Sequence, residues 1–128
     1  NINQITSLPF LLRGFSAGGL YSYFFSQYYQ NRTIAFSNIK GARSFEAGSN
    51  NKSVPGFIIA GENDTGRVEP MKNYFLSHRA NKSVWTFAIE PNSGHSVDNS
   101  DILTRAFFSA VLKKRLIKEI TSSNLFNT

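Results

Sequence analysis

The stretch LLRGFSAGGLYSY, residues 11–23, decides how the rest of this sequence is interpreted. A short apolar run leads into it, an aromatic-rich run follows it, and Ser16 stands between Gly14 and Gly18. The spacing G-x-S-x-G is typical of a strand that turns sharply into a helix and exposes a serine at the turn. We expect Gly14 and Gly18 to remove side chains that would collide there, which makes Ser16 a candidate nucleophile.

The same glycines have two other interpretations. In the first, Ser16 is a plain helix N-cap and the glycines serve a tight turn. In the second, the glycines form a phosphate-binding loop, but Leu20 and Tyr21 stand where that motif needs a lysine and a serine or threonine. The phosphate loop is therefore disfavoured, and the choice between cap and nucleophile depends on the rest of the chain.

Apolar runs alternate with longer amphipathic stretches along the whole sequence. We predict strands near residues 8–14, 34–40, 55–60 and 84–90, and helices over residues 17–30, 69–80 and 100–120. Alternating strands and helices indicate an α/β fold with a parallel sheet. Residues 42–53 are polar and bear a glycine, so they form either a short crossover helix or an excursion over a site.

The spacing of apolar residues also predicts which helix faces are buried. In the first helix the expected stripe contains Leu20, Phe24 and Tyr28, with Tyr21 and Phe25 beside it. Pro70 suits the first turn of the second helix. The expected stripe of the last helix, which Ser100 or Asp101 can cap, contains Ile102, Ala106, Phe107, Ala110, Val111 and Leu112.

Composition indicates one globular domain over residues 1–128. Apolar residues make up 41% of the chain and charged residues 17%, and twelve phenylalanines supply core volume. No apolar run approaches the ~20 residues of a membrane span, and no signal-peptide pattern is visible, so the compartment stays open. The absence of cysteine excludes disulfides, thiol catalysis and thiolate metal sites.

The chain carries a formal charge of +6. Its one dense basic cluster, at the end of the last predicted helix, has no aromatic residues interleaved and suits the helix dipole: Lys113, Lys114, Arg115 and Lys118. A solvated surface is therefore favoured over nucleic-acid binding. The two histidines, at 78 and 95, do not have the spacing of a metal site. We expect no cofactor.

A serine nucleophile needs a base, and the base needs an acid to orient it. His95 lies in a loop directly after the fourth predicted strand, whereas His78 lies inside a helix and is expected at the surface. After the third strand, Asp64 and Glu62 compete for the role of the acid, and Asp64 is preferred because it lies further out on the loop. Ser16, Asp64 and His95 each follow the end of a predicted strand, and open α/β sheets bind ligands at that edge.

Taken together, the segments GFSAGG, VPGFIIAGENDTGRVEP and SGHSV resemble the α/β-hydrolase family, over about residues 8–116. GFSAGG resembles the nucleophile elbow of esterases and depolymerases, and the other two resemble the segments that carry the family's acid and histidine. The order Ser16, Asp64, His95 is also that of the family. The resemblance implies that the four predicted strands correspond to the fifth to eighth strands of that fold, which makes the chain its C-terminal half.

The resemblance further implies a serine hydrolase that acts on small-molecule or polymer esters through an acyl-enzyme, with the Ala17 N–H in the oxyanion hole. The other half of the same protein would supply the earlier strands and the second oxyanion donor, and without it strand 8–14 is an open apolar edge. Two alternatives stay open: a peptidase of the prolyl-oligopeptidase type, and a hydrolase-like domain that binds without catalysis.

Overall fold

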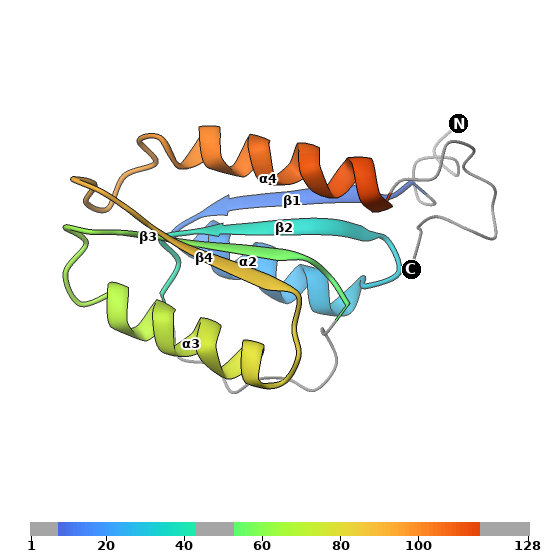
Figure 1. Ribbon diagram of the computed structural model, residues 1–128, viewed down its shortest axis with the longest axis horizontal. Coiled ribbons are helices and arrows are strands. Elements are labelled where there is room, and N and C mark those ends of the chain that lie inside the picture. Colours follow the sequence, from blue (N-terminus) through green and yellow to red (C-terminus); the bar gives the residue numbers. More distant parts are fainter. Residues whose placement is uncertain (1–7, 43–52, 116–128) are drawn as a thin grey trace.

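The computed structural model describes residues 8–42 and 53–115, which form a sheet flanked by helices (Figure 1). Its elements in chain order are β1 (Phe10–Phe15), α2 (Ala17–Tyr28), β2 (Thr33–Ile39), β3 (Gly56–Gly61), α3 (Val68–Ala80), β4 (Trp85–Glu90) and α4 (Ser100–Arg115). The four predicted strands are confirmed, each within two residues of its expected bounds. The undetermined segment 42–53 falls, except for its end residues, outside the described residues.

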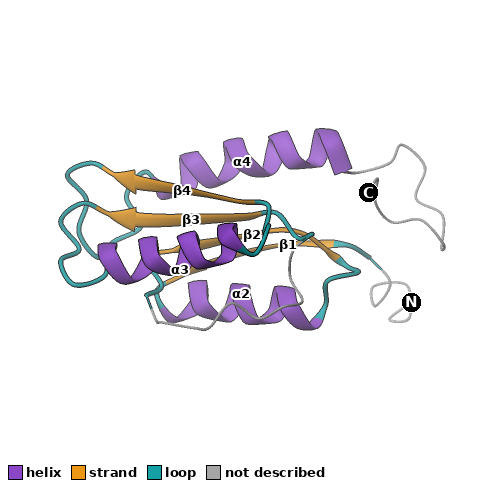
Figure 2. Cartoon of the chain, turned by 60° about the horizontal axis from the view of Figure 1, so that its bottom comes forward, coloured by secondary structure: helices purple, strands orange, loops and turns teal. Residues whose placement is uncertain are grey.

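The sheet has the order β1-β2-β3-β4, and each neighbouring pair is parallel, as predicted. Helices α2 and α3 cover one face and α4 covers the other (Figures 1 and 2). Because all four strands run in the same direction, their carboxyl ends meet at one edge of the sheet. Within the described part of the chain β1 has β2 as its one partner, so β1 is an edge strand.

The core lies on both faces of β2 and β3, whose residues are all buried. Burial on both faces is why β3 appears in the sequence as a continuous apolar run. In β2 the buried polar residues Ser37 and Asn38 have hydrogen-bond partners. The larger cluster, under α2 and α3, contains Tyr23, Phe36, Val54, Ile58, Ala60, Met71, Tyr74 and Trp85. Under α4, Ile39, Phe57 and Ile59 pack against Phe107. In the described residues no helix is both long and apolar enough to cross a membrane.

The predicted buried face of α2 is largely wrong, although Leu20 and Phe25 are half-buried. Tyr28 is 84% exposed and Tyr21 64% exposed, whereas the residues that face the sheet are Gly19, Ser22, Tyr23 and Ser26. Small side chains on this face let the helix approach β1 and β2 closely, and the hydroxyls of Ser22 and Ser26 bond to backbone carbonyls of the helix itself. The close approach of α2 to the sheet, and not the spacing of its apolar residues, therefore decides which face of the helix is buried.

The predicted stripe of α4 is also partly wrong. Ile102 is 67% exposed, and the residues buried in this helix are Ser100 and Thr104. Thr104 lies over β2, where its hydroxyl forms a hydrogen bond of 2.8 Å with that of Ser37, and Phe107 packs against Phe57 as expected. A polar strand residue under the helix thus selects a polar partner.

The two proposed caps of α4 make other contacts. The Ser100 hydroxyl donates to Glu90, and the Asp101 carboxylate accepts from Arg13. In α3, Pro70 does occupy the first turn, as predicted.

His78 is fully buried, which contradicts the surface position expected from the sequence. Its ring stacks on Trp85 at 3.9 Å between centroids, and its Nε2 lies 3.3 Å from the Tyr23 hydroxyl. No hydrogen-bond partner is found for its Nδ1 among the described residues. Burial lowers the pKa of His78 from 6.5 to about 4.

This burial predicts a loss of stability in mild acid. Between about pH 6.5 and pH 4 the unfolded chain protonates His78 and the folded chain does not, so the free energy of unfolding falls as the pH falls. For one group the slope reaches about 1.4 kcal/mol per pH unit. We expect urea titrations at pH 7, 6 and 5 to show that the free energy of unfolding falls less steeply with falling pH in His78→Phe than in the wild type. An equal pH dependence of the free energy of unfolding in the two proteins would contradict a neutral buried imidazole.

Candidate active site

Ser16 occupies the single residue between β1 and α2. Its backbone has φ 55° and ψ −121°, a conformation that is strained for a residue with a side chain. The Ser16 N–H donates to the Ile39 carbonyl at 2.8 Å, which fixes the turn against the end of β2. A Cβ at position 14 would lie 1.9 Å from the Gly18 carbonyl oxygen, so only glycine allows α2 to begin so close to β1.

The second glycine of the motif has a different role from the one predicted. A Cβ on Gly18 would meet nothing within 4 Å, whereas one on Gly19 would lie 2.1 Å from the Asn38 amide oxygen. The Asn38 side chain is buried and exchanges two hydrogen bonds of 2.9 Å with the backbone of Gly41. Gly19 is therefore the residue that lets α2 pack on the turn after β2.

His95 lies on the loop after β4, and its Nε2 is 2.9 Å from the Ser16 Oγ. The two residues are 79 positions apart in the sequence and meet at the carboxyl edge of the sheet. The His95 ring packs against that of Phe15, with 5.0 Å between ring centroids. Sequence reasoning did not single out Phe15, although its place next to Ser16 in the motif is the signal that would have found it.

Asp64 lies on the other side of the imidazole, with its Oδ2 2.8 Å from the His95 Nδ1. Its carboxylate is buried, and its Oδ1 accepts from the Arg67 guanidinium at 2.9 Å. Burial alone would raise the pKa of Asp64, but the hydrogen bonds from His95 and Arg67 outweigh it and lower the pKa below its usual 3.8. Arg67 was also absent from the sequence candidates, although it lies three residues after Asp64 in the same turn.

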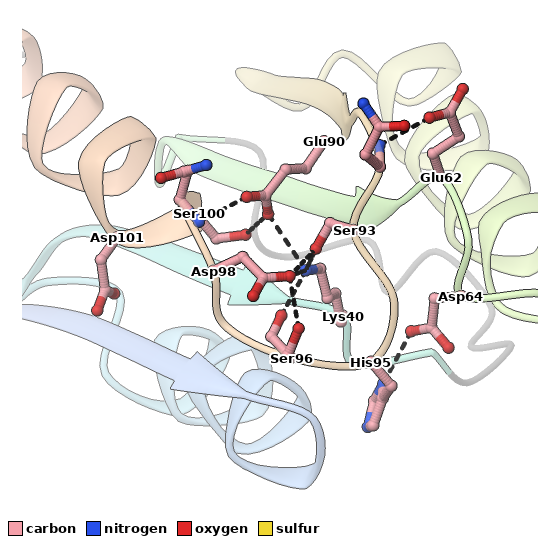
Figure 3. Close-up of polar contacts among 12 residues, drawn as sticks. Lys40, Glu62, Asp64, Glu90, Ser93, His95, Ser96, Asp98, Ser100 and Asp101 are labelled. Atoms are coloured by element: carbon pink, nitrogen blue, oxygen red, sulfur yellow. Dashed lines mark hydrogen bonds and ion pairs between the residues drawn. The ribbon is translucent and has the colours of Figure 1, made fainter.

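Glu62, the competing acid, does not contact His95. Its side chain is exposed, and its Oε2 accepts from the backbone N–H of Asn92 at 2.8 Å (Figure 3). Glu62 thus holds the start of the loop that carries His95, and Asp64 is the carboxylate that meets the imidazole.

The contacts define the hydrogen-bond direction through the three side chains. An ionised carboxylate only accepts hydrogen bonds, so the His95 Nδ1 carries the proton that is shared with Asp64. The Nε2 then presents a lone pair to the Ser16 hydroxyl, and the hydroxyl donates to it. This arrangement can take a proton from Ser16 while holding the imidazole in one orientation.

Compared by sequence, the chain matches no protein-family model and no curated protein. Compared by structure, it is similar to SOBER1 of Arabidopsis thaliana, with 17% identity, a TM-score of 0.68, and coverage of 80% of this chain and 52% of that one. A protein of Thermoplasma acidophilum described as a predicted CIB-like hydrolase gives 14% identity and a TM-score of 0.63, with coverage of 84% of this chain and 53% of that one. The chain has the C-terminal half of an α/β-hydrolase fold.

A third solved structure, from a study of carboxylesterases of Nitrososphaera gargenis, gives 10% identity and a TM-score of 0.63. The match covers 88% of this chain and 69% of that one. The chain thus spans about half the length of the first two structures and about two thirds of the third. At these identities the likeness establishes the shared fold.

The two glycines of the helix start give a matched pair of predictions. We expect Gly19→Ala to lower the free energy of unfolding by about 1–3 kcal/mol, because the new methyl group collides with the buried Asn38 amide. We expect Gly18→Ala to be neutral or stabilising by up to about 1 kcal/mol, because the position is open and alanine favours a helix. Urea unfolding of both variants measures the difference, and equal effects would contradict the assigned roles.

Proposed function

We propose that this chain carries the nucleophile, base and acid of a serine hydrolase that acts on carboxylic esters. The observation that supports this most directly is the continuous hydrogen-bond chain from Ser16 through His95 to Asp64, with distances of 2.9 and 2.8 Å. The three side chains come from three loops at the carboxyl edge of the sheet, and their order in the chain is that of α/β hydrolases.

In the proposed reaction the Ser16 Oγ attacks the ester carbonyl carbon while the His95 Nε2 takes the hydroxyl proton. His95 returns that proton to the leaving alcohol, and the acyl group stays on Ser16. A water molecule, deprotonated by His95, then attacks the acyl carbon, and His95 gives the proton to the Ser16 oxygen as its bond to the acyl group breaks and the acid leaves. Asp64 keeps the Nδ1 proton in place and stabilises the imidazolium, and its lowered pKa suits this role because the carboxylate stays ionised.

The negative charge that develops on the carbonyl oxygen needs donors. Ala17 is the first residue of α2, where backbone N–H groups have no partner within the helix and the helix dipole is positive. We assign the Ala17 N–H as one oxyanion donor. The family resemblance implies that a second donor comes from a loop among the earlier strands of the fold.

Two alternatives are weaker on specific grounds. A binding domain without catalysis does not require a strained serine at 2.9 Å from an oriented imidazole. A peptidase would use the same three residues, so the choice of ester rests on the elbow sequence GFSAGG and on the likeness to the Nitrososphaera carboxylesterase structure. The ester substrate is a small molecule or a polymer.

A fluorophosphonate probe tests the nucleophile. We expect the probe to label the wild-type protein on Ser16, and we expect Ser16→Ala to remove both the label and the hydrolysis of p-nitrophenyl esters. A panel of acyl esters and proline-containing peptides should show turnover of the esters. Labelling at another residue, or turnover that survives in Ser16→Ala, would contradict the assignment.

The acid is tested by a pair of amide substitutions. Asp64→Asn should lower kcat by about 10³–10⁴-fold, because the asparagine amide favours the imidazole tautomer that cannot accept the Ser16 proton. Glu62→Gln should change kcat less than about tenfold, because glutamine keeps an acceptor for the Asn92 N–H and Glu62 does not touch His95. Steady-state kinetics of both variants decide the matter, and a larger loss for Glu62→Gln would reverse the two roles.

A further inference from the structure

Lys40 is a fully buried lysine directly after the end of β2. Its backbone has φ 55°, which is uncommon for a residue with a side chain and redirects the chain at the strand end. Lysine is almost never fully buried unless its ammonium is paired. The role of this residue was not anticipated from the sequence, where it appears as the single charge that ends the run TIAFSNIK.

The Lys40 ammonium points into the loop that joins β4 to α4, residues 91–99, which we call the histidine loop (Figure 3). It donates to the Glu90 Oε2 at 3.2 Å, to the Ser93 hydroxyl and to the Ser96 carbonyl. The carboxylate of Asp98 lies 3.8 Å away. One cation therefore contacts the last residue of β4 and three positions of the histidine loop.

Other hydrogen bonds complete this network. Glu90 also accepts from the Asn99 N–H and from the Ser100 hydroxyl, both at 2.6 Å. Burial would raise the pKa of Glu90, but these bonds and Lys40 outweigh it and lower the pKa. Asp98 accepts from the hydroxyls of Ser93 and Ser96, which lowers its pKa. Both carboxylates are therefore ionised, and together they outnumber the single lysine that they face.

His95 lies between the two loop residues to which Lys40 donates hydrogen bonds. Ser93 precedes it by two positions, and Ser96 follows it directly. The loop is also pressed onto β3, since a Cβ at Gly61 would lie 2.6 Å from the carbonyl oxygens of Ser93 and Gly94 and 3.0 Å from the Lys40 Cε. Lys40 thus fills the space between the strand ends and the backbone on both sides of His95.

We propose that Lys40 is a positioning residue for the base: its ammonium fixes the histidine loop so that the His95 Nε2 meets the Ser16 hydroxyl. This inference rests on the proposed function. A buried ion pair is a weak source of stability compared with apolar packing, so its value here lies in the geometry that it specifies. A misplacement of about 1 Å can cost about 10²-fold in rate.

The test compares Lys40→Met with a variant in which the ammonium is removed and then restored. Lys40→Cys is alkylated with 2-bromoethylamine in the unfolded state and refolded, which replaces the lysine Cγ by sulfur and returns the charge to its place. The 128 residues contain no cysteine, so the introduced thiol is the one site for alkylation in this sequence. Lys113→Cys, at an exposed position of α4, is treated identically as the control.

We expect Lys40→Met and unmodified Lys40→Cys to lower the rate of fluorophosphonate labelling of Ser16, and kcat for p-nitrophenyl acetate, by about 10–100-fold, with KM changed less than about threefold. Aminoethylation should restore most of the loss at position 40 and change nothing at position 113. The downfield proton resonance of the His95–Asp64 hydrogen bond should weaken in Lys40→Met and return in aminoethylated Lys40→Cys.

The outcomes separate the two proposals. A wild-type protein that is neither labelled nor active overturns the proposed function. An active wild type together with a folded Lys40→Met of unchanged kcat and unchanged resonance overturns the role of Lys40 and leaves the proposed function standing. If Lys40→Met does not fold, Ser93→Ala, which removes the hydroxyl that joins Lys40 to Asp98 and keeps the Lys40–Glu90 ion pair, should lower kcat by about 3–10-fold, and an unchanged kcat would overturn the role of Lys40.

Discussion

The approach of α2 to β1 at Gly14 is the constraint on which the rest of the site depends. The strand passes into the helix through one residue, and any side chain at position 14 would overlap the backbone of Gly18. The same sharp turn forces Ser16 into its positive φ, and there its hydroxyl meets the imidazole of His95. The loops after β3 and β4 hold the Asp64 carboxylate and the His95 imidazole beside that hydroxyl, because parallel strands bring their loops to the same edge.

The fold and the meeting of Ser16, Asp64 and His95 at one sheet edge could be predicted because each depends on a strong local signal. β3 is apolar throughout, β2 is rich in β-branched and aromatic residues, β4 is followed by a loop with one histidine, and G-x-S-x-G marks the turn at Ser16. The buried faces of α2 and α4 could not be predicted, because they depend on distance to the sheet and on Ser37 beneath α4. His78 was misplaced for the same reason, since its partners Tyr23 and Trp85 belong to other elements.

Lys40 illustrates a different limit of sequence reasoning. A charged residue at the end of an apolar strand is normally solvated, and the sequence does not show that Glu90 and the histidine loop enclose it. Its carboxylate partner, Glu90, is 50 residues away, so the local sequence pattern around Lys40 cannot predict the pairing. A similar long-range bond from the Asn92 N–H to Glu62 holds the start of the same loop, which is why Glu62 lies near the site without touching the imidazole.

The acid and the base of the site are positioned by contacts of very different range. Asp64 is held within its own turn, where its N–H bonds to Gly61 and its carboxylate to Arg67, each three residues away. Asp64 also divides its two oxygens between Arg67 and His95, so the two partners do not compete. His95 depends on both kinds of contact: Asp98 bonds to Ser93 and Ser96 within the loop, and the loop itself is tied to β2 through Lys40 and to the end of β3 through Glu62. Local turns re-form readily after a perturbation, whereas long-range contacts require the whole sheet edge to be in register. The position of the imidazole, more than that of the carboxylate, therefore responds to changes elsewhere in the fold.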